Sequence, residues 1–150
     1  MTKNDLVKVI DDYLTPVGFI RKDKTWYKET PETIVMFTID KSQYSILYYV
    51  SVHFFLKEVS SEKFPKFWKS HSYFRAEDYM EEDTKNYLDL ENDLDDKIRK
   101  VKIKQLLEKS LSILKLFETK EGIKKTLSLY NPRALGINLK AQKYLGIHIP

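Results

Sequence analysis

The chain of 150 residues contains no cysteine, only four glycines and no long hydrophobic run. Without cysteine it forms no disulfide, thiolate nucleophile or cysteine-based zinc site. Glycine is too scarce for a loop that cradles phosphates, which argues against a nucleotide cofactor. No window approaches the roughly 18 apolar residues of a membrane helix, and the polar N-terminus predicts no signal peptide. We therefore expect one cytoplasmic domain, residues 1–150, with no cofactor and no membrane association.

The net charge of +4 conceals a strong asymmetry along the chain. Residues 77–96 include ten acids and one lysine, a net charge of −9. From residue 97 to the C-terminus, thirteen lysines and arginines stand against three glutamates, a net charge of +10. An acidic run that leads directly into a basic one predicts that the two meet, either in this fold or across a partner.

The stretch from Tyr44 to Lys57 is the clearest structural signal in the chain. Alternate residues are apolar, whereas the residues between them are mixed. This pattern predicts a long central strand with one dry face, since β-branched and aromatic side chains suit a pleated surface. The apolar set is Ile46, Tyr48, Val50, Val52, Phe54 and Leu56.

The segments around this strand predict an α+β fold. Thr2 and Asp5 start a short amphipathic helix that ends at Thr15-Pro16-Val17-Gly18. Strands are expected at 19–30 and 33–40, and a fourth at 71–75, so that an antiparallel meander of three or four strands forms. Residues 81–96 are predicted to form a solvated loop with a short strand or turn at 87–90.

Helices are expected to follow and to cover the apolar face of the sheet. The first begins at Asn92 or Asp93, and Thr119 caps a second. Asn131-Pro132 starts a third helical segment, which Gly136 is expected to split in two and which ends at Gly146. The expected apolar stripe of the first helix is Leu94, Ile98, Val101, Leu107, Leu111, Leu114 and Phe117, and Ile103, Leu106 and Ile113 broaden it.

Several short blocks resemble the bacterial domain-of-unknown-function 4304 family. They include Asp12-Tyr13-Leu14-Thr15-Pro16-Val17-Gly18-Phe19-Ile20-Arg21-Lys22, Lys41-Ser42-Gln43-Tyr44, Arg75-Ala76-Glu77-Asp78 and the ending from Ala134 to Ile147. The order and spacing of these blocks agree over most of the chain. The resemblance implies a bacterial origin and an α+β fold, and it implies no activity.

His71, Arg75 and Glu77 form the one cluster that suggests an enzyme. A hydrolase could use a histidine and a carboxylate as base and orienting group, with an arginine on an anion. The alternative is an ion pair at a strand end and a solvated turn. His53 is expected to be a hydrogen-bonded structural residue, and the three histidines lack the spacing of metal ligands, so no metal site is predicted.

Aromatic residues alternate with lysines in several places, and Trp68 is the most prominent of them. Such a pattern could stack bases and contact phosphates, as single-stranded nucleic-acid binders do. No motif of a known nucleic-acid-binding family accompanies it, and aromatic residues on strands more often belong to a core. The residues concerned are Trp26, Tyr27, Tyr49, Phe67, Trp68 and Tyr73, with Lys22, Lys24, Lys28, Lys66 and Lys69.

The acidic segment offers a third hypothesis. A carboxylate-rich loop can imitate a phosphate backbone and block a basic active site, as an immunity-type protein would do to a nuclease toxin. The competing interpretation is a loop neutralised by the basic C-terminal helices. We expect a non-catalytic protein-binding module, and the candidate binding residues are Trp68, His71, Arg75, Glu77, Glu81, Glu82, Asp83 and Asp89.

Overall fold

A computed structural model describes residues 1–150. Helix α1 spans Lys3–Leu14 and begins with the expected capping box, in which Thr2 and Asp5 each accept a hydrogen bond from the other's backbone amide. Its inward face buries Leu6, Ile10 and Leu14. A 3₁₀ turn, η1 (Thr15–Val17), follows and ends at Gly18, whose φ of 101° is accessible to glycine at little cost.

The sheet is an antiparallel meander of five strands in the order of the sequence, which confirms the predicted fold class. The strands are β1 (Ile20–Lys22), β2 (Thr25–Glu29), β3 (Thr33–Lys41), β4 (Tyr48–Leu56) and β5 (Phe74–Arg75). The single strand expected at 19–30 is instead a hairpin, in which Ile20 pairs with Tyr27. The chain reverses at Asp23, whose φ of 57° lies in the left-handed region that a short turn requires.

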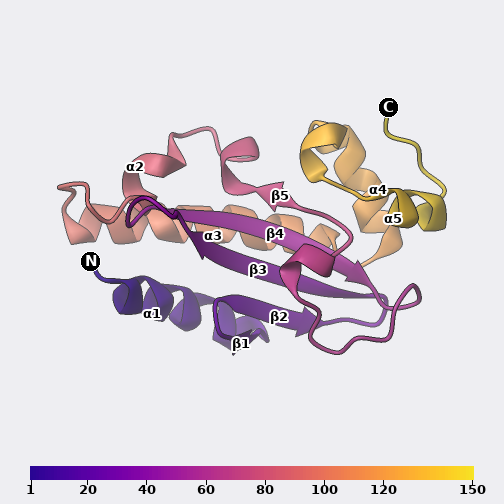
Figure 1. Ribbon diagram of the computed structural model, residues 1–150, viewed down its shortest axis with the longest axis horizontal. Coiled ribbons are helices and arrows are strands. Elements are labelled where there is room, and N and C mark those ends of the chain that lie inside the picture. Colours follow the sequence, from indigo (N-terminus) through magenta and orange to yellow (C-terminus); the bar gives the residue numbers. More distant parts are fainter.

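Strand β4 lies in the sheet interior as expected, between β3 and β5. Its alternate residues from Tyr48 to Leu56 belong to the main hydrophobic core. Ile46, which was expected to continue this row, lies before the strand and is 40% exposed. The apolar face of the sheet is covered by helices, and Figure 1 shows α3 crossing behind the strands.

The C-terminal part consists of α3 (Asp96–Leu116), α4 (Lys120–Leu129), the 3₁₀ turn η4 (Pro132–Leu135) and α5 (Leu139–Leu145). The predicted caps at Thr119 and Asn131 are present, and Gly146 ends α5 in the left-handed region. Helix α3 begins a little later than expected, with Asp95 as its cap in place of Asn92 or Asp93.

The buried face of α3 agrees with the predicted stripe from Ile103 onward and differs from it in the first turns of the helix. Ile98 and Val101 are 52% and 54% exposed, whereas Arg99 is buried on the same face as Ile103 and Leu107. The hydrophobic residues near the start of the helix were therefore assigned to the wrong side, because the helix meets the acidic segment there rather than the sheet alone.

The second face of the sheet is also covered, although the sequence suggested that only one face would be dry. The long connection between β4 and β5 passes in front of the strands (Figure 1). Beneath it lies a separate small hydrophobic cluster of Tyr27, Ile34, Met36 and Phe55. This connection contains the turn η2 (Phe67–Lys69), and Tyr27 ties it to the sheet by donating a hydrogen bond to the Pro65 carbonyl.

Residues 76–96 are more ordered than the solvated loop that the sequence predicted. They form the turn η3 (Ala76–Asp78) and the short helix α2 (Thr84–Leu88), and Asp89 then bridges to Leu47 beside the start of β4. The fourth strand expected at 71–75 is reduced to the two residues of β5. None of the helices has both the length and the apolar character that crossing a membrane requires.

Candidate functional site

The acidic segment, residues 77–96, is held against the body of the protein by its uncharged side chains. Tyr79, Thr84, Tyr87 and Leu88 are all at most 6% exposed, so the segment places an anchor in the core at several points along its length. The Asp83 carboxylate accepts a hydrogen bond from the Lys85 amide and caps α2. Because the anchors point inward, the carboxylates between them are left at the surface.

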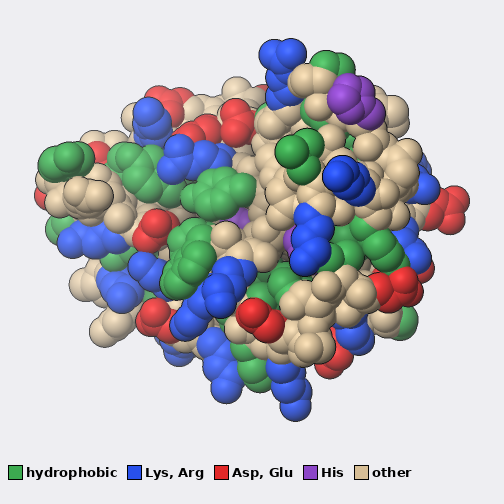
Figure 2. Space-filling view, turned by 45° about the vertical axis from the view of Figure 1, so that its right-hand side comes forward, with side chains coloured by type: hydrophobic (Ala, Val, Ile, Leu, Met, Phe, Trp, Pro, Cys, Tyr) green, Lys and Arg blue, Asp and Glu red, His purple; other side chains and the backbone are tan.

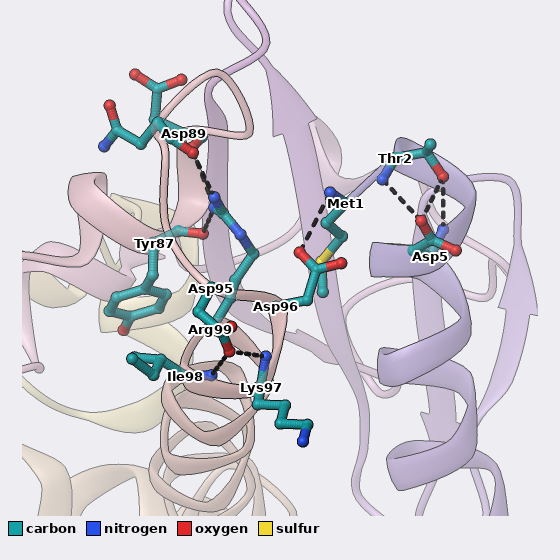
Figure 3. Close-up of polar contacts among 11 residues, drawn as sticks. Met1, Thr2, Asp5, Tyr87, Asp89, Asp95, Asp96, Lys97, Ile98 and Arg99 are labelled. Carbon is teal, nitrogen blue, oxygen red and sulfur yellow. Dashed lines mark hydrogen bonds and ion pairs between the residues drawn. The ribbon is translucent and has the colours of Figure 1, made fainter.

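Arg99 of α3 is hydrogen-bonded to the backbone of this segment. Its guanidinium donates hydrogen bonds to the carbonyl oxygens of Tyr87 at 2.6 Å and Asp89 at 3.0 Å, and to that of Asn92 at 2.9 Å. Figure 3 shows the guanidinium directed at the carbonyls of Tyr87 and Asp89. We call this set of contacts the Arg99 clamp. A planar guanidinium suits the task because its donors are arranged in a rigid fork.

The Arg99 clamp is unusual in its choice of partners. Arg99 is 1% exposed and is the one charged side chain buried in the fold. A buried cation is normally paired with a carboxylate, since burial without compensation is very costly. The acidic segment contains ten acids, yet the three hydrogen-bond partners of Arg99 are backbone carbonyl oxygens. The clamp therefore ties residues 87–92 of the acidic segment to α3 without neutralising the carboxylates of the segment.

The carboxylates themselves are only partly engaged. Three form ion pairs: Glu82 with Lys102 at 2.6 Å, Asp96 with the Met1 amino group at 3.3 Å and Glu77 with Arg75 at 3.4 Å. Asp83, Asp89 and Asp95 accept hydrogen bonds from nearby backbone amides, which leaves their charge in place. The side chains without any partner are Asp78, Glu81, Glu91 and Asp93.

The predicted neutralisation of this segment by the basic helices amounts to one contact. Lys102 is the single lysine of α3 that forms an ion pair with an acid of the segment. Lys97, Lys100 and Lys104 are exposed and pair with no carboxylate. The two oppositely charged segments are therefore neighbours in the fold, but most of the acidic charge remains uncompensated at the surface.

The suggested cluster of His71, Arg75 and Glu77 is not brought together. His71 is 4% exposed, stacks on Phe55 and accepts a hydrogen bond at Nδ1 from the Leu56 amide at 2.8 Å. Arg75 pairs with Glu77 and lies over the ring of Tyr49, opposite Ser51 on β4. Ser51 and Leu56 are five positions apart along the strand, a separation of about 16 Å. The imidazole is too far from the ion pair to share a reaction with it.

Two buried imidazoles are uncharged because of their surroundings. Burial lowers the pKa of His53 to about 4, and the same cause lowers the pKa of His71 to about 4. His53 is fully enclosed, with hydrogen bonds of 2.8 Å to the Ser51 hydroxyl and the Ser72 carbonyl oxygen. Its contacts hold the β4–β5 connection on the sheet. No group of three histidine, aspartate or glutamate side chains is arranged to hold a metal ion.

A family model covers most of these features. The model of the domain-of-unknown-function 4304 family (DUF4304) matches residues 10–119, which run from the second half of α1 to the cap of α4. The chain belongs to this family. Neither a curated protein nor a solved structure matches it.

Within this DUF4304 protein, the matched span includes the whole sheet, the acidic segment and Arg99. Sequence analysis missed Arg99 as a functional residue, although a signal was present. The buried positions Ile103, Leu107, Ser110 and Leu114 define one face of α3, and one turn back along that face lies position 99. Trp68, the remaining candidate, lies apart from the acidic segment on the β4–β5 connection and is 66% exposed.

Proposed function

We propose that this DUF4304 protein is a non-catalytic protein-binding module, and that its acidic segment receives a basic partner protein. The observation that carries the proposal is the Arg99 clamp, which orders the backbone of the segment and leaves its carboxylates exposed. A surface built in this way is ready for a cationic partner before that partner arrives.

The clamp matters because ordering a loop opposes binding. Each flexible side chain or loop that a partner must immobilise reduces the affinity, so a segment that is already ordered binds more tightly for the same contacts. The anchors Tyr87 and Leu88 and the clamp together impose this order in the free protein. Charge complementarity then speeds the encounter and disfavours partners of the wrong sign.

The chemistry of the partner follows from the exposed groups. A row of carboxylates on a fixed backbone imitates the charge, though not the shape, of a nucleic-acid backbone. We therefore infer a partner whose basic surface ordinarily contacts phosphates, such as a nuclease, and an immunity-like role in which the acidic segment covers that surface.

The test compares two charge-matched double variants in capture experiments. Glu81→Lys with Glu91→Lys reverses two acids of the segment that have no internal partner, so the fold is kept. Glu108→Lys with Glu121→Lys makes the same change in net charge at two exposed acids outside the segment. The immobilised proteins are exposed to extract of the native cells at low salt, and the retained proteins are quantified by mass spectrometry.

We expect the wild type and the Glu108/Glu121 variant to retain the same basic protein, and the Glu81/Glu91 variant to lose it. A long-range effect of net charge alone would weaken both variants equally. Equal retention by all three proteins, or retention of no basic protein by the wild type, would contradict the proposal.

A further inference from the structure

A second surface of the molecule combines aromatic rings with uncompensated lysines. It is a hollow of about 520 Å³ between the β1–β2 hairpin and the connection that follows β4. We call it the aromatic cleft, and its walls include Tyr27, Phe64, Phe67, Trp68, Lys22 and Lys66. Figure 2 shows hydrophobic and basic side chains interleaved on a face of the molecule. A volume of this size is typical of pockets that hold small ligands.

The aromatic rings of the cleft are fixed in place. Tyr27 is buried, packs edge-to-face on Phe64 at 5.4 Å and donates its hydroxyl hydrogen to the Pro65 carbonyl at 2.9 Å. Phe67 packs edge-to-face on Trp68 at 5.1 Å. The Lys22 ammonium lies over one face of the Phe64 ring, so Trp68, which is 66% exposed, is the most accessible ring of the cleft. The cleft is therefore a preformed site and needs little rearrangement to accept a planar group.

Trp68 is the residue that sets this surface apart from a core. It is 66% exposed, whereas the other tryptophan, Trp26, is fully buried against Phe37 on the opposite face of the sheet. An isolated exposed aromatic residue is common and carries no meaning by itself. Trp68 is different because Phe64, which is 40% exposed, lines the same hollow.

The charges around the cleft select an anionic ligand. The Lys22 ammonium lies 4.8 Å from the centre of the Phe64 ring and forms no ion pair, and Lys66 has no acidic partner either. Lys24 is already paired with Asp40 at 3.0 Å, and Asp23 is the one acid in the wall. Two ammonium groups without a carboxylate partner therefore line the same hollow as the exposed indole.

We propose that the aromatic cleft binds single-stranded nucleic acid, with one base stacked on Trp68 and the adjoining phosphates held by Lys22 and Lys66. Base stacking on aromatic side chains, together with a cationic track for the backbone, is the usual means of binding single strands. A duplex would hide the faces of its bases from the indole. An acidic peptide would satisfy the lysines but would not use the exposed ring.

The size of the cleft bounds the interaction. It accommodates one or two nucleotides, so we expect the affinity to be weak to moderate. Because every base offers a flat face for stacking, the affinity should depend little on the nucleotide sequence. Two phosphate contacts predict a log–log salt dependence with a slope of about −1.4 for a single strand. This inference is independent of the acidic segment, because neither Lys22 nor Trp68 contributes to it.

The experiment uses the full chain and fluorescein-labelled decauridine as the probe. Fluorescence anisotropy gives the dissociation constant at about 20 mM and about 150 mM KCl. Unlabelled decauridine should also quench the emission of the wild-type protein, because Trp68 is the accessible tryptophan and Trp26 is enclosed. A duplex of equal length and a polyglutamate peptide serve as competitors.

We expect Trp68→Ala to weaken binding by about five- to 150-fold, the range found for removing a stacked aromatic residue. Its matched control is Tyr44→Ala, which removes an aromatic side chain that is 93% exposed in the β3–β4 connection. Lys22→Ala with Lys66→Ala should flatten the salt dependence almost to zero, whereas the exposed pair Lys124→Ala with Lys125→Ala should leave it nearly unchanged. Circular dichroism checks that each variant keeps its fold.

Three results would overturn the inference. The first is absence of binding at low salt. The second is equal weakening by Trp68→Ala and Tyr44→Ala. The third is that polyglutamate displaces the oligonucleotide at comparable concentration and binds the Trp68→Ala variant undiminished, which would assign the cleft to acidic peptides.

Discussion

Replacing Arg99 by lysine tests how the acidic segment is held. The substitution keeps one positive charge on the same face of α3 but removes the fork of donors that reaches three carbonyl oxygens. A lysine ammonium is a compact group on a flexible stem, so it can stay near one carbonyl and must leave at least one other without a partner. The backbone of residues 87–92 would then be less tightly fixed.

The magnitude follows from the contacts that are lost. A hydrogen bond to a charged group contributes about 1.5–3 kcal/mol to stability, and losing one or two of them suggests about 3 kcal/mol. The Arg99 Nε–H is buried without a partner, which already opposes part of this stabilisation in the wild type. We therefore expect Arg99→Lys to lower the free energy of unfolding by about 2 kcal/mol, a large fraction of the about 5–15 kcal/mol typical of a domain.

Urea denaturation followed by circular dichroism measures this difference. The matched control is Lys100→Arg, the reverse exchange at the next residue of α3, where the side chain is exposed and makes no ion pair. A surface exchange of this kind should change the stability by no more than about 0.5 kcal/mol. If Arg99→Lys unfolds at the same urea concentration as Lys100→Arg, the clamp contributes nothing and the reasoning is refuted.

Three further predictions concern stability. Burial lowers the folded-state pKa of His53 to about 4, below the unfolded value of 6.5. The stability that neutral His53 allows should therefore be fully present at pH 7 and be lost as the pH falls through 6.5 towards 4. At pH 5 the free energy of unfolding should be lower by about 2 kcal/mol from His53 alone, and His71 acts in the same direction. A urea midpoint that is the same at pH 7 and pH 5 would contradict this. Gly136→Ala should lower the melting temperature more than Gly146→Ala, because both have positive φ but only at 136 would the added Cβ lie 2.6 Å from a backbone oxygen. Asp95→Ala should destabilise α3 by about 1 kcal/mol, since two amides lose their cap, and thermal melting without a shift would argue against that role.

Local signals in the sequence predicted the parts of the fold that are decided locally. The helix caps at Thr2 and Thr119 and the glycine stop at Gly146 each depend on a few neighbouring residues, and the structure has them as expected. Strand β4 was equally clear, because its alternation extends over nine residues. These features need no knowledge of distant contacts.

The features that the sequence did not reveal are set by tertiary contacts. The covering of the second face of the sheet depends on Tyr27 and Pro65, which are 38 residues apart. Only the N-terminal end of the buried face of α3 was misplaced, because Arg99 looks like a solvent-exposed basic residue among lysines. Its partners are backbone carbonyls, which every residue possesses, so no pattern of residue types marks them.

The candidate site, too, has a part that the sequence predicts and a part that is set by tertiary contacts. Charge alone pointed to residues 77–96, and the structure adds which of these acids are engaged and which are free. The apparent cluster of His71, Arg75 and Glu77 arose from proximity in sequence, whereas pairing along β4 separates the imidazole from the ion pair.

Amide hydrogen exchange across residues 77–96 tests most directly whether the acidic segment is a preformed surface. The account predicts strong protection of the Asp89 and Leu90 amides, which donate to Lys85 and Ile46 carbonyl oxygens, and much faster exchange at these two sites in Arg99→Lys. Exchange of the whole segment in the wild type at the rate of an unstructured peptide would contradict it.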